Sequence, residues 1–112
     1  MPIETVERDK GLEIKMSGSF DRQASEELEE MIEENGSHEN IVVNLFDVNY
    51  ISSVSIGTLV KLHRNLGSES KSFMISNVSE ECQEIFDMIE ISEILPIYDD
   101  VEDALAGKSS KK

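Results

Sequence analysis

The sequence predicts an α/β domain in which helices cover a mostly parallel β-sheet. Strand and helix patterns alternate along the chain after an opening hairpin, as parallel strands joined by right-handed crossovers require. One nearly continuous apolar run, residues 40–48, has the composition of a strand buried on both faces. The 112 residues suffice for one core. We therefore expect a single domain over residues 1–106 and a flexible tail over 107–112.

The chain opens with two expected strands. "GLEIKMSG" alternates strictly: its apolar residues are Leu12, Ile14 and Met16. Glu13 and Lys15 lie between them, so we expect these two to face solvent on a half-buried strand. "IETVER" at 3–8 is a weaker strand, and "DKG" between the two has the composition of a turn. Together they predict a hairpin.

A helix is expected over residues 21–35. Its apolar positions recur with helical spacing and are Ala24, Leu28, Met31 and Ile32. Asp21 is the expected N-cap, and Asn35 with Gly36 the expected end. Its other side carries six glutamates: Glu26, Glu27, Glu29, Glu30, Glu33 and Glu34. They could dock a basic partner, but a charge run more often forms an ordinary solvated surface.

The central strand and the next helix follow. Because the run at 40–48 fits only a central strand, we expect Val42, Val43 and Leu45 to be almost fully buried. The helix is expected over 53–66 with Gly67 as its C-terminal stop. Its inward stripe is predicted to be Ile56, Leu59, Val60, His63 and Leu66.

The last third repeats the alternation. Strands are expected at 71–77 and 94–98, and helices at 79–90 and 99–107. Ser79 is expected to begin the first helix, and Asp99 or Asp100 to cap the second. The residues expected to face inward are Val78, Cys82, Ile85, Phe86, Ile89, Val101, Ala104 and Leu105.

Composition narrows the function classes. The net charge of −14 argues against nucleic acid or an anionic membrane as a partner and suits a basic protein or simple solubility. No apolar run approaches the ~20 residues that span a bilayer, and no basic and apolar leader opens the chain, so a cytoplasmic protein is expected. The single cysteine, Cys82, rules out an internal disulfide, and its spacing favours a buried position.

No enzymatic site can be assembled from the sequence. Neither glycine-rich phosphate loop is present, and no serine lies in a G-x-S-x-G elbow. His38 and His63 are too few and too far apart for a metal cluster. A base role for His63 toward Ser53 fails, because ten helical residues separate the two by about 15 Å. We expect neither an enzyme nor a bound metal or cofactor.

Three serines stand where the buried strand meets the second helix: Ser52, Ser53 and Ser55. A helix N-terminus carries unpaired N–H groups and the positive end of the helix dipole. A serine there can cap the helix or, once phosphorylated, hold a dianion that the helix end tolerates. Position alone favours capping, because serine is an ordinary N-cap.

A family resemblance favours phosphorylation of one of them. The stretches that carry it are "MSGSFD", "IVVNLFDVNYISSVSIGTLVKLHRNL" and "ISNVSEECQEIFDMIEISEILPIYDDVEDALA". In order and spacing, from Leu12 to Ala106, they resemble the STAS domain of bacterial anti-sigma-factor antagonists. The family's loop reads roughly Tyr-Ile-Asp-Ser-Ser-Gly-Leu-Gly, and the serine after the aspartate accepts phosphate. The resemblance places Ser53 at that acceptor and implies a STAS-like fold with about four helices.

Three positions depart from the family's pattern. Asn44 and Ser52 stand where aspartates are frequent, and Val54-Ser55 replaces a small residue and a glycine. Ser55 thus adds a side chain that could alter access to the loop. The residues expected around the acceptor, in the loop or against a partner, are Asp21, Ser52, Val54, Ser55, Ile56 and Gly57.

The resemblance implies a regulatory binding protein. It would bind a serine-kinase anti-sigma factor, which itself binds ATP and Mg²⁺, and phosphorylation of Ser53 would end the binding. The alternative is an unphosphorylated STAS scaffold, or an accessory subunit of a sensory assembly or of a lipid ABC transporter.

Overall fold

The computed structural model describes residues 3–107 and contains one mixed sheet of five strands, in the order β1-β2-β3-β4-β5. The strands are β1 (Ile3–Arg8), β2 (Gly11–Phe20), β3 (Asn40–Ile51), β4 (Ser72–Ser76) and β5 (Ile97–Tyr98). β1 pairs with β2 antiparallel, and every other neighbouring pair is parallel. The predicted α/β class, the opening hairpin and the mostly parallel sheet are confirmed. Of the tail expected at 107–112, all but Gly107 lies outside the described residues.

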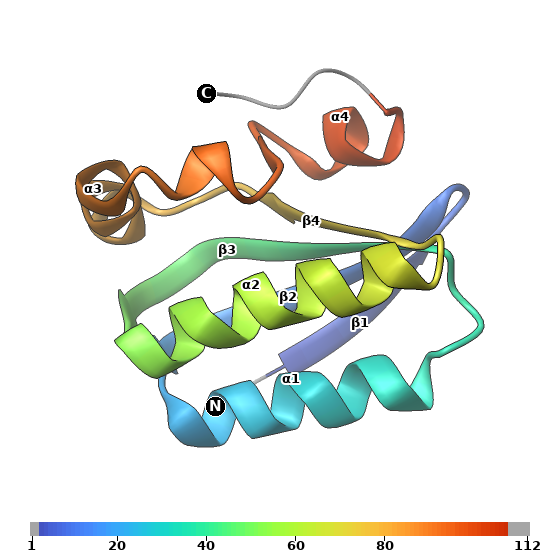
Figure 1. Cartoon of the computed structure of the whole chain (residues 1–112), viewed down its shortest axis with the longest axis horizontal. Coiled ribbons are helices and arrows are strands. Elements are labelled where there is room, and N and C mark those ends of the chain that lie inside the picture. Colours follow the sequence, from blue (N-terminus) through green and yellow to red (C-terminus); the bar gives the residue numbers. More distant parts are fainter. Residues whose placement is uncertain (1–2, 108–112) are drawn as a thin grey trace.

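Helices lie on both sides of this sheet (Figure 1). They are α1 (Arg22–Glu34), α2 (Ser53–Ser68), α3 (Glu80–Ile89), the short 3-10 helix η1 (Ile91–Glu93) and α4 (Val101–Leu105). α1 and α2 run side by side along one face, and α4 packs on the opposite face of the sheet. α3 lies beside the C-terminal half of β3, where its buried Cys82 and Phe86 join the same core as α1 and α2. α3 is fastened to the C-terminal half of β3, because the Ser79 hydroxyl donates to the carbonyl oxygen of Val48.

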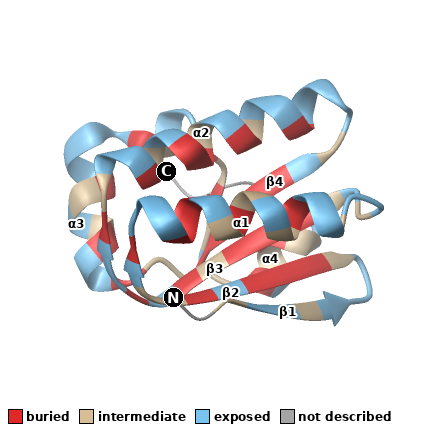
Figure 2. Cartoon of the chain, turned by 90° about the horizontal axis from the view of Figure 1, so that it is seen from below, coloured by how far each residue is buried: buried red, intermediate tan, exposed pale blue. Residues whose placement is uncertain are grey.

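The buried strand lies at the centre, as predicted. Val42, Val43 and Leu45 have no exposed surface, and the buried residues follow the strands beneath α1 and α2 (Figure 2). Val43 and Leu45 belong to the main core. Val42 belongs to a smaller apolar cluster on the opposite face, which is made with Met74, Val101, Ala104, Tyr98 and Leu105. Both faces of β3 are therefore covered, which explains its continuous apolar run.

Glu13 corrects one prediction. The alternation of apolar and polar residues in β2 predicted that Glu13 faces solvent, but Glu13 is only 1% exposed. Its register partner on β3 is Val42, so the two side chains share the face that α4 covers. Glu13 remains hydrogen-bonded there: it accepts from Arg8 Nε at 3.0 Å and from Asn44 Nδ2 at 2.9 Å. Arg8, Glu13 and Asn44 are called the carboxylate cluster below.

Most helix starts are as predicted. Asp21, Ser52, Ser79 and Asp100 cap α1, α2, α3 and α4, each accepting a bond from a backbone N–H three residues later. Asn35, just after Glu34, ends α1, also as predicted.

The end of α2 was predicted wrongly. The helix passes through Gly67 to Ser68, and the residue with positive φ is Ser70. Lys71 N donates to Leu66 O and Ser70 N to Gly67 O, which is the Schellman pattern with a serine in the left-handed position usually taken by glycine.

Two inward faces also differ from the prediction. In α2, Leu62 is buried together with Leu59 and Leu66, although it was not expected to face inward, whereas His63 is half-buried, as are Ile56 and Val60. Ile89, at the end of α3, is exposed. The strand expected over 94–98 is reduced to Ile97–Tyr98, since η1 and the turn after it occupy the preceding residues.

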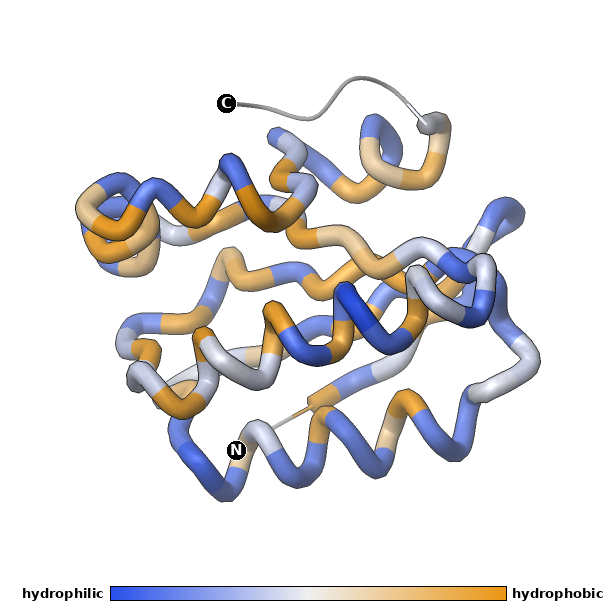
Figure 3. The backbone as a smooth tube through the Cα atoms, in the orientation of Figure 1, coloured by the Kyte–Doolittle hydropathy of each residue, from blue (hydrophilic) through white to orange (hydrophobic). Residues whose placement is uncertain are grey.

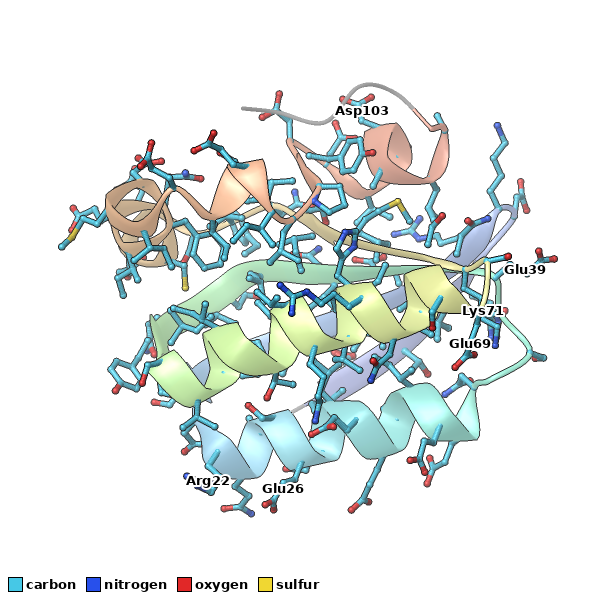
Figure 4. All side chains as sticks on the ribbon, viewed as in Figure 1. Arg22, Glu26, Glu39, Glu69, Lys71 and Asp103 are labelled. Atoms are coloured by element: carbon cyan, nitrogen blue, oxygen red, sulfur yellow. The ribbon has the colours of Figure 1, made fainter. Side chains whose placement is uncertain are left out.

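The acidic side of α1 faces outward. In Figure 3 its outer surface is hydrophilic and its apolar residues turn toward the sheet. Figure 4 shows Arg22 and Glu26 pointing away from the sheet. One glutamate of the run, Glu29, pairs with Lys61 of α2. The outer side of α1 is therefore largely solvated, and Glu29 links it to the neighbouring helix through Lys61.

Candidate functional site

The three serines lie where β3 ends and α2 begins, next to the point where β2 passes into α1 (Figure 1). The backbone joins these two junctions directly, because Ser52 N donates to Phe20 O at 3.1 Å. The carboxyl ends of parallel strands thus meet at this edge, the place where sites form in open α/β sheets.

Ser52 is the N-cap of α2, as predicted. Its backbone is extended, and its hydroxyl oxygen accepts a hydrogen bond from Ser55 N at 3.2 Å. The hydroxyl also lies 3.0 Å from the Ser55 hydroxyl. The Ser52 hydroxyl therefore makes two hydrogen-bonding contacts with Ser55, and the one to the backbone N–H caps the start of α2.

Ser55 points into the protein rather than toward solvent. It has no exposed surface, and its Oγ lies 2.6 Å from Phe20 O and 3.1 Å from Asp21 O. A buried Ser25 Oγ from α1 completes the contacts at 2.9 Å. The added side chain at this loop position therefore supports the loop from inside and does not cover it. Ser55, expected in the loop or against a partner, is fully buried here.

Ser53 differs from both neighbours. It is exposed at the first position of α2, and its hydroxyl has no hydrogen-bond partner among residues 3–107. The three serines thus differ in environment: Ser52 caps the helix, Ser53 has a free hydroxyl, and Ser55 is buried and supports the loop. Of the three, only Ser53 presents a hydroxyl that an incoming group can reach.

The surface around Ser53 combines apolar and acidic groups. Tyr50 is 53% exposed and Val54 40% exposed, on either side of the serine. Gly57 is also exposed, and a Cβ added there would meet no atom within 4 Å. Ile56 is half-buried against the core. Asp21 is exposed at the start of α1, where its carboxylate accepts from Ala24 N at 3.0 Å.

Sequence reasoning missed Ser25. It lies on α1 one position after Ala24 and is only 2% exposed. A polar residue next to a core position carries no sequence signal of its own. Its role emerges only when Ser55, 30 residues later, is brought within 2.9 Å of it. Ser25, Ser52 and Ser55 are called the serine cluster below.

The described residues contain neither a metal-binding cluster nor a membrane-spanning helix. Within residues 3–107, no group of three or more His, Cys, Asp or Glu side chains is arranged to hold a metal ion. Across the same residues, every helix is too short or too polar to cross a membrane. Cys82 is buried, and burial raises the pKa of its thiol.

Both the sequence and the fold of this chain resemble those of known proteins. The model of the STAS domain matches residues 2–104. An anti-sigma-B factor antagonist of Staphylococcus epidermidis is 30% identical over 103 residues, which cover 89% of this chain and 94% of that protein. A Staphylococcus aureus protein of the same name is 29% identical over the same shares of both chains.

Solved structures share the fold at lower identity. An anti-sigma factor antagonist from Mycobacterium paratuberculosis superposes with a TM-score of 0.80 at 20% identity, covering 94% of this chain and 91% of that one. Unphosphorylated SpoIIAA, an anti-sigma factor antagonist, gives 0.74 at 16% identity, covering 95% and 97%. Its phosphorylated form, from Bacillus, gives 0.68 at 16% identity, covering 90% and 95%. Since the family model spans nearly the whole chain, the chain belongs to the STAS domain family.

Proposed function

We propose that this protein is an anti-sigma-factor antagonist that binds a serine-kinase anti-sigma factor and is switched off by phosphorylation of Ser53. The observation that carries the proposal is the environment of Ser53. Among the three serines of the junction, it is the one whose hydroxyl is exposed and unengaged in the described part of the chain. The names of the Staphylococcus relatives support the antagonist role.

The geometry allows phosphate at Ser53 without harm to the fold. Ser53 is the first residue of α2, where unpaired N–H groups and the helix dipole favour negative charge. The hydroxyl is already in water, so the dianion remains hydrated in the free protein. Folding and phosphorylation are therefore compatible at this position.

Binding is where the phosphate acts. Tyr50, three residues before Ser53, and Val54, directly after it, are both exposed, so a partner that packs on these two side chains would also cover the serine. A neutral hydroxyl is readily desolvated, whereas a dianion without a cationic partner costs several kcal/mol to bury. The protein is itself strongly acidic, with a net charge of −14, so a phosphate adds repulsion toward any acidic patch on the partner.

The chemistry of phosphate transfer belongs to the partner. The kinase supplies ATP and Mg²⁺, and this chain supplies the acceptor hydroxyl as a substrate and ligand. The switch would operate in the cytoplasm, where sigma factors meet RNA polymerase. We infer no catalytic group in this protein.

Two substitutions at Ser53 separate folding from binding. Ser53→Ala removes the acceptor and should keep both the fold and partner binding. Ser53→Asp should keep the fold, with a change in unfolding free energy of about 0.3–1 kcal/mol in the stabilising direction. It should nevertheless weaken the complex, because the added carboxylate must be desolvated on binding.

The experiment begins with a pull-down from an extract of the native cells. Mass spectrometry identifies the captured proteins and the phosphorylated residue within peptide 48–63. The captured kinase is then titrated against wild type, Ser53→Ala, Ser53→Asp and Ser68→Asp, with thermal melts of each. Ser68→Asp is the matched control, since it adds the same charge at the other end of α2.

Equal affinity of Ser53→Ala and Ser53→Asp for the kinase contradicts the switch. Capture of an ABC ATPase or of a large homologous assembly, with no phosphate on peptide 48–63, favours the scaffold or transporter-subunit alternative instead.

A further inference from the structure

The buried hydroxyls behind Ser53 form a closed set of hydrogen bonds. A serine hydroxyl has one proton to donate and two lone pairs to accept with. The shortest contact of Ser55 Oγ, 2.6 Å to Phe20 O, assigns its proton to that carbonyl. Its lone pairs then accept from the hydroxyls of Ser25 at 2.9 Å and Ser52 at 3.0 Å. Every hydrogen-bonding position of Ser55 is thereby used.

This set joins three elements at one point. Ser25 belongs to the first turn of α1, Ser55 to the first turn of α2, and Phe20 is the last residue of β2. Ser25 reaches α2 by hydrogen bond only through Ser55 among the described residues. The start of α2, and with it the exposed Ser53, is therefore held against the start of α1 by the serine cluster.

We propose that Ser55, supported by Ser25, is a positioning residue that fixes the backbone of the first turn of α2 and so the place from which the Ser53 hydroxyl is presented. The inference rests on the proposed function for what Ser53 does, but the cluster itself does not. Ser55 touches no partner, because it has no exposed surface. Its effect on Ser53 is transmitted through the backbone of the first turn of α2.

Removal of the Ser55 hydroxyl leaves both of its carbonyl partners with other hydrogen bonds, so Ser55→Ala tests the positioning role without exposing a new unpaired buried carbonyl. Phe20 O keeps the bond from Ser52 N at 3.1 Å. Asp21 O keeps the bond from Ser25 N at 2.9 Å, and the Ser25 hydroxyl, also 2.9 Å away, can turn its proton to Asp21 O once Ser55 Oγ is gone. Since no buried carbonyl is orphaned, Ser55→Ala should fold and lose order only at the junction.

The first arm of the experiment needs no kinase. Amide hydrogen exchange is measured by NMR on wild type, Ser55→Ala, Ser25→Ala, the double variant and the control Ser68→Ala. In Ser55→Ala the amides of residues 55 and 56 should exchange about tenfold faster, as expected for the loss of local hydrogen bonds. Ser68→Ala removes a hydroxyl at the other end of α2 and should leave these amides unchanged.

The double variant adds a consistency test. Because Ser25 acts on α2 through Ser55, the double variant should exchange no faster at residues 55 and 56 than Ser55→Ala alone. If Ser55→Ala does not fold, the same amide exchange is measured on Ser25→Ala instead. In that variant Ser55 still donates to Phe20 O, so the junction is weakened less.

The second arm uses the kinase captured with the wild-type protein. In Ser55→Ala, kcat for phosphate transfer to Ser53 should fall between about tenfold and a hundredfold, the effect of a misplaced acceptor. KM and Kd should stay within about twofold of wild type, because Ser55 is absent from the surface. A merely structural residue would change the melting temperature without this split between kcat and KM.

Each outcome decides a different point. Unchanged amide exchange in Ser55→Ala overturns the positioning role regardless of any kinase. Faster exchange with unchanged kcat, or a raised KM with unchanged kcat, overturns it as well. If wild type is never phosphorylated, the proposed function fails, whereas the exchange arm still establishes or refutes the control of the loop by the serine cluster.

Discussion

The serine cluster and the carboxylate cluster are both buried and polar, yet they are built from opposite chemistry. The serine cluster lies at the C-terminal end of β2 and contains only neutral hydroxyls and carbonyls. The carboxylate cluster lies near the N-terminal end of the same strand and buries the ionised side chain of Glu13. A neutral cluster fixes local geometry at little electrostatic cost, whereas a buried charge makes stability depend on its partners and on pH.

The ionised state of Glu13 is maintained by its partners. Burial by itself raises the pKa of Glu13. The hydrogen bonds from Asn44 and Arg8, together with the charge of Arg8, outweigh that effect and hold the pKa below its ordinary value. Asn44 is also positioned by its own bond, since its Oδ1 accepts from Phe46 N at 2.9 Å. An aspartate at this position would instead set a second carboxylate beside Glu13.

The largest expected effect comes from breaking the carboxylate cluster. Glu13→Ala leaves the Asn44 amide without its acceptor and Arg8 without its carboxylate. Since Arg8 is 41% exposed and can return to water, we expect a loss of about 1–3 kcal/mol in unfolding free energy. Urea denaturation measures this loss. The control is Glu4→Ala, which removes an exposed glutamate on β1 and should leave the unfolding free energy within about 0.5 kcal/mol of wild type. A Glu13→Ala variant as stable as that control contradicts the assignment.

The pH dependence sharpens the comparison. A carboxyl whose native pKa is lowered stabilises the fold above its unfolded pKa, about 4.3 for glutamate, and loses that contribution as pH falls through the native pKa. The stability difference between wild type and Glu13→Gln should therefore be constant above about pH 6 and shrink below about pH 4. For Ser55→Ala, which removes no charge, the difference should stay constant over the same range. A Glu13→Gln difference that grows on acidification contradicts this account.

The smallest effect is expected at the cap. Ser52→Ala removes the oxygen that accepts from Ser55 N and should lower the unfolding free energy by about 0.5–2 kcal/mol, near the low end because Ser55 still holds the junction. Thermal melts against Ser68→Ala measure it. Ser53 should remain phosphorylatable in this variant, and phosphopeptide mapping that finds phosphate solely on Ser52 of the wild type contradicts the assignment of the two serines.

The sequence was a good guide where one local rule decides. The buried run of β3, the hairpin and the four N-caps follow from composition, alternation and capping chemistry, and the structure confirms them. Ser52 as a cap belongs to this class. Ser53 as the acceptor stays a prediction, because its exposure is compatible with the role but does not establish it.

The failures share a different origin. Glu13 is buried because α4, at the far end of the chain, covers its face, and alternation within β2 contains no information about that helix. Ser25 and Ser55 meet across 30 residues. The end of α2 depends on Ser70 adopting the left-handed conformation, although a glycine stood three residues earlier. In each case a contact or a backbone choice set by tertiary structure overrode the local pattern.

The length of β3 has a consequence for how the family can vary. Two register shifts against β2 each insert one extra residue into β3, so that beyond Leu45 the buried positions recur at every third residue, Val48 and Ile51. Two adjacent side chains, such as Asn49 and Tyr50, then face outward together. Deletion of one residue in this stretch would restore the ordinary alternation of buried and exposed residues. A core side chain would then point toward solvent. Natural variants should therefore change the exposed residues of this segment far more readily than its number of residues.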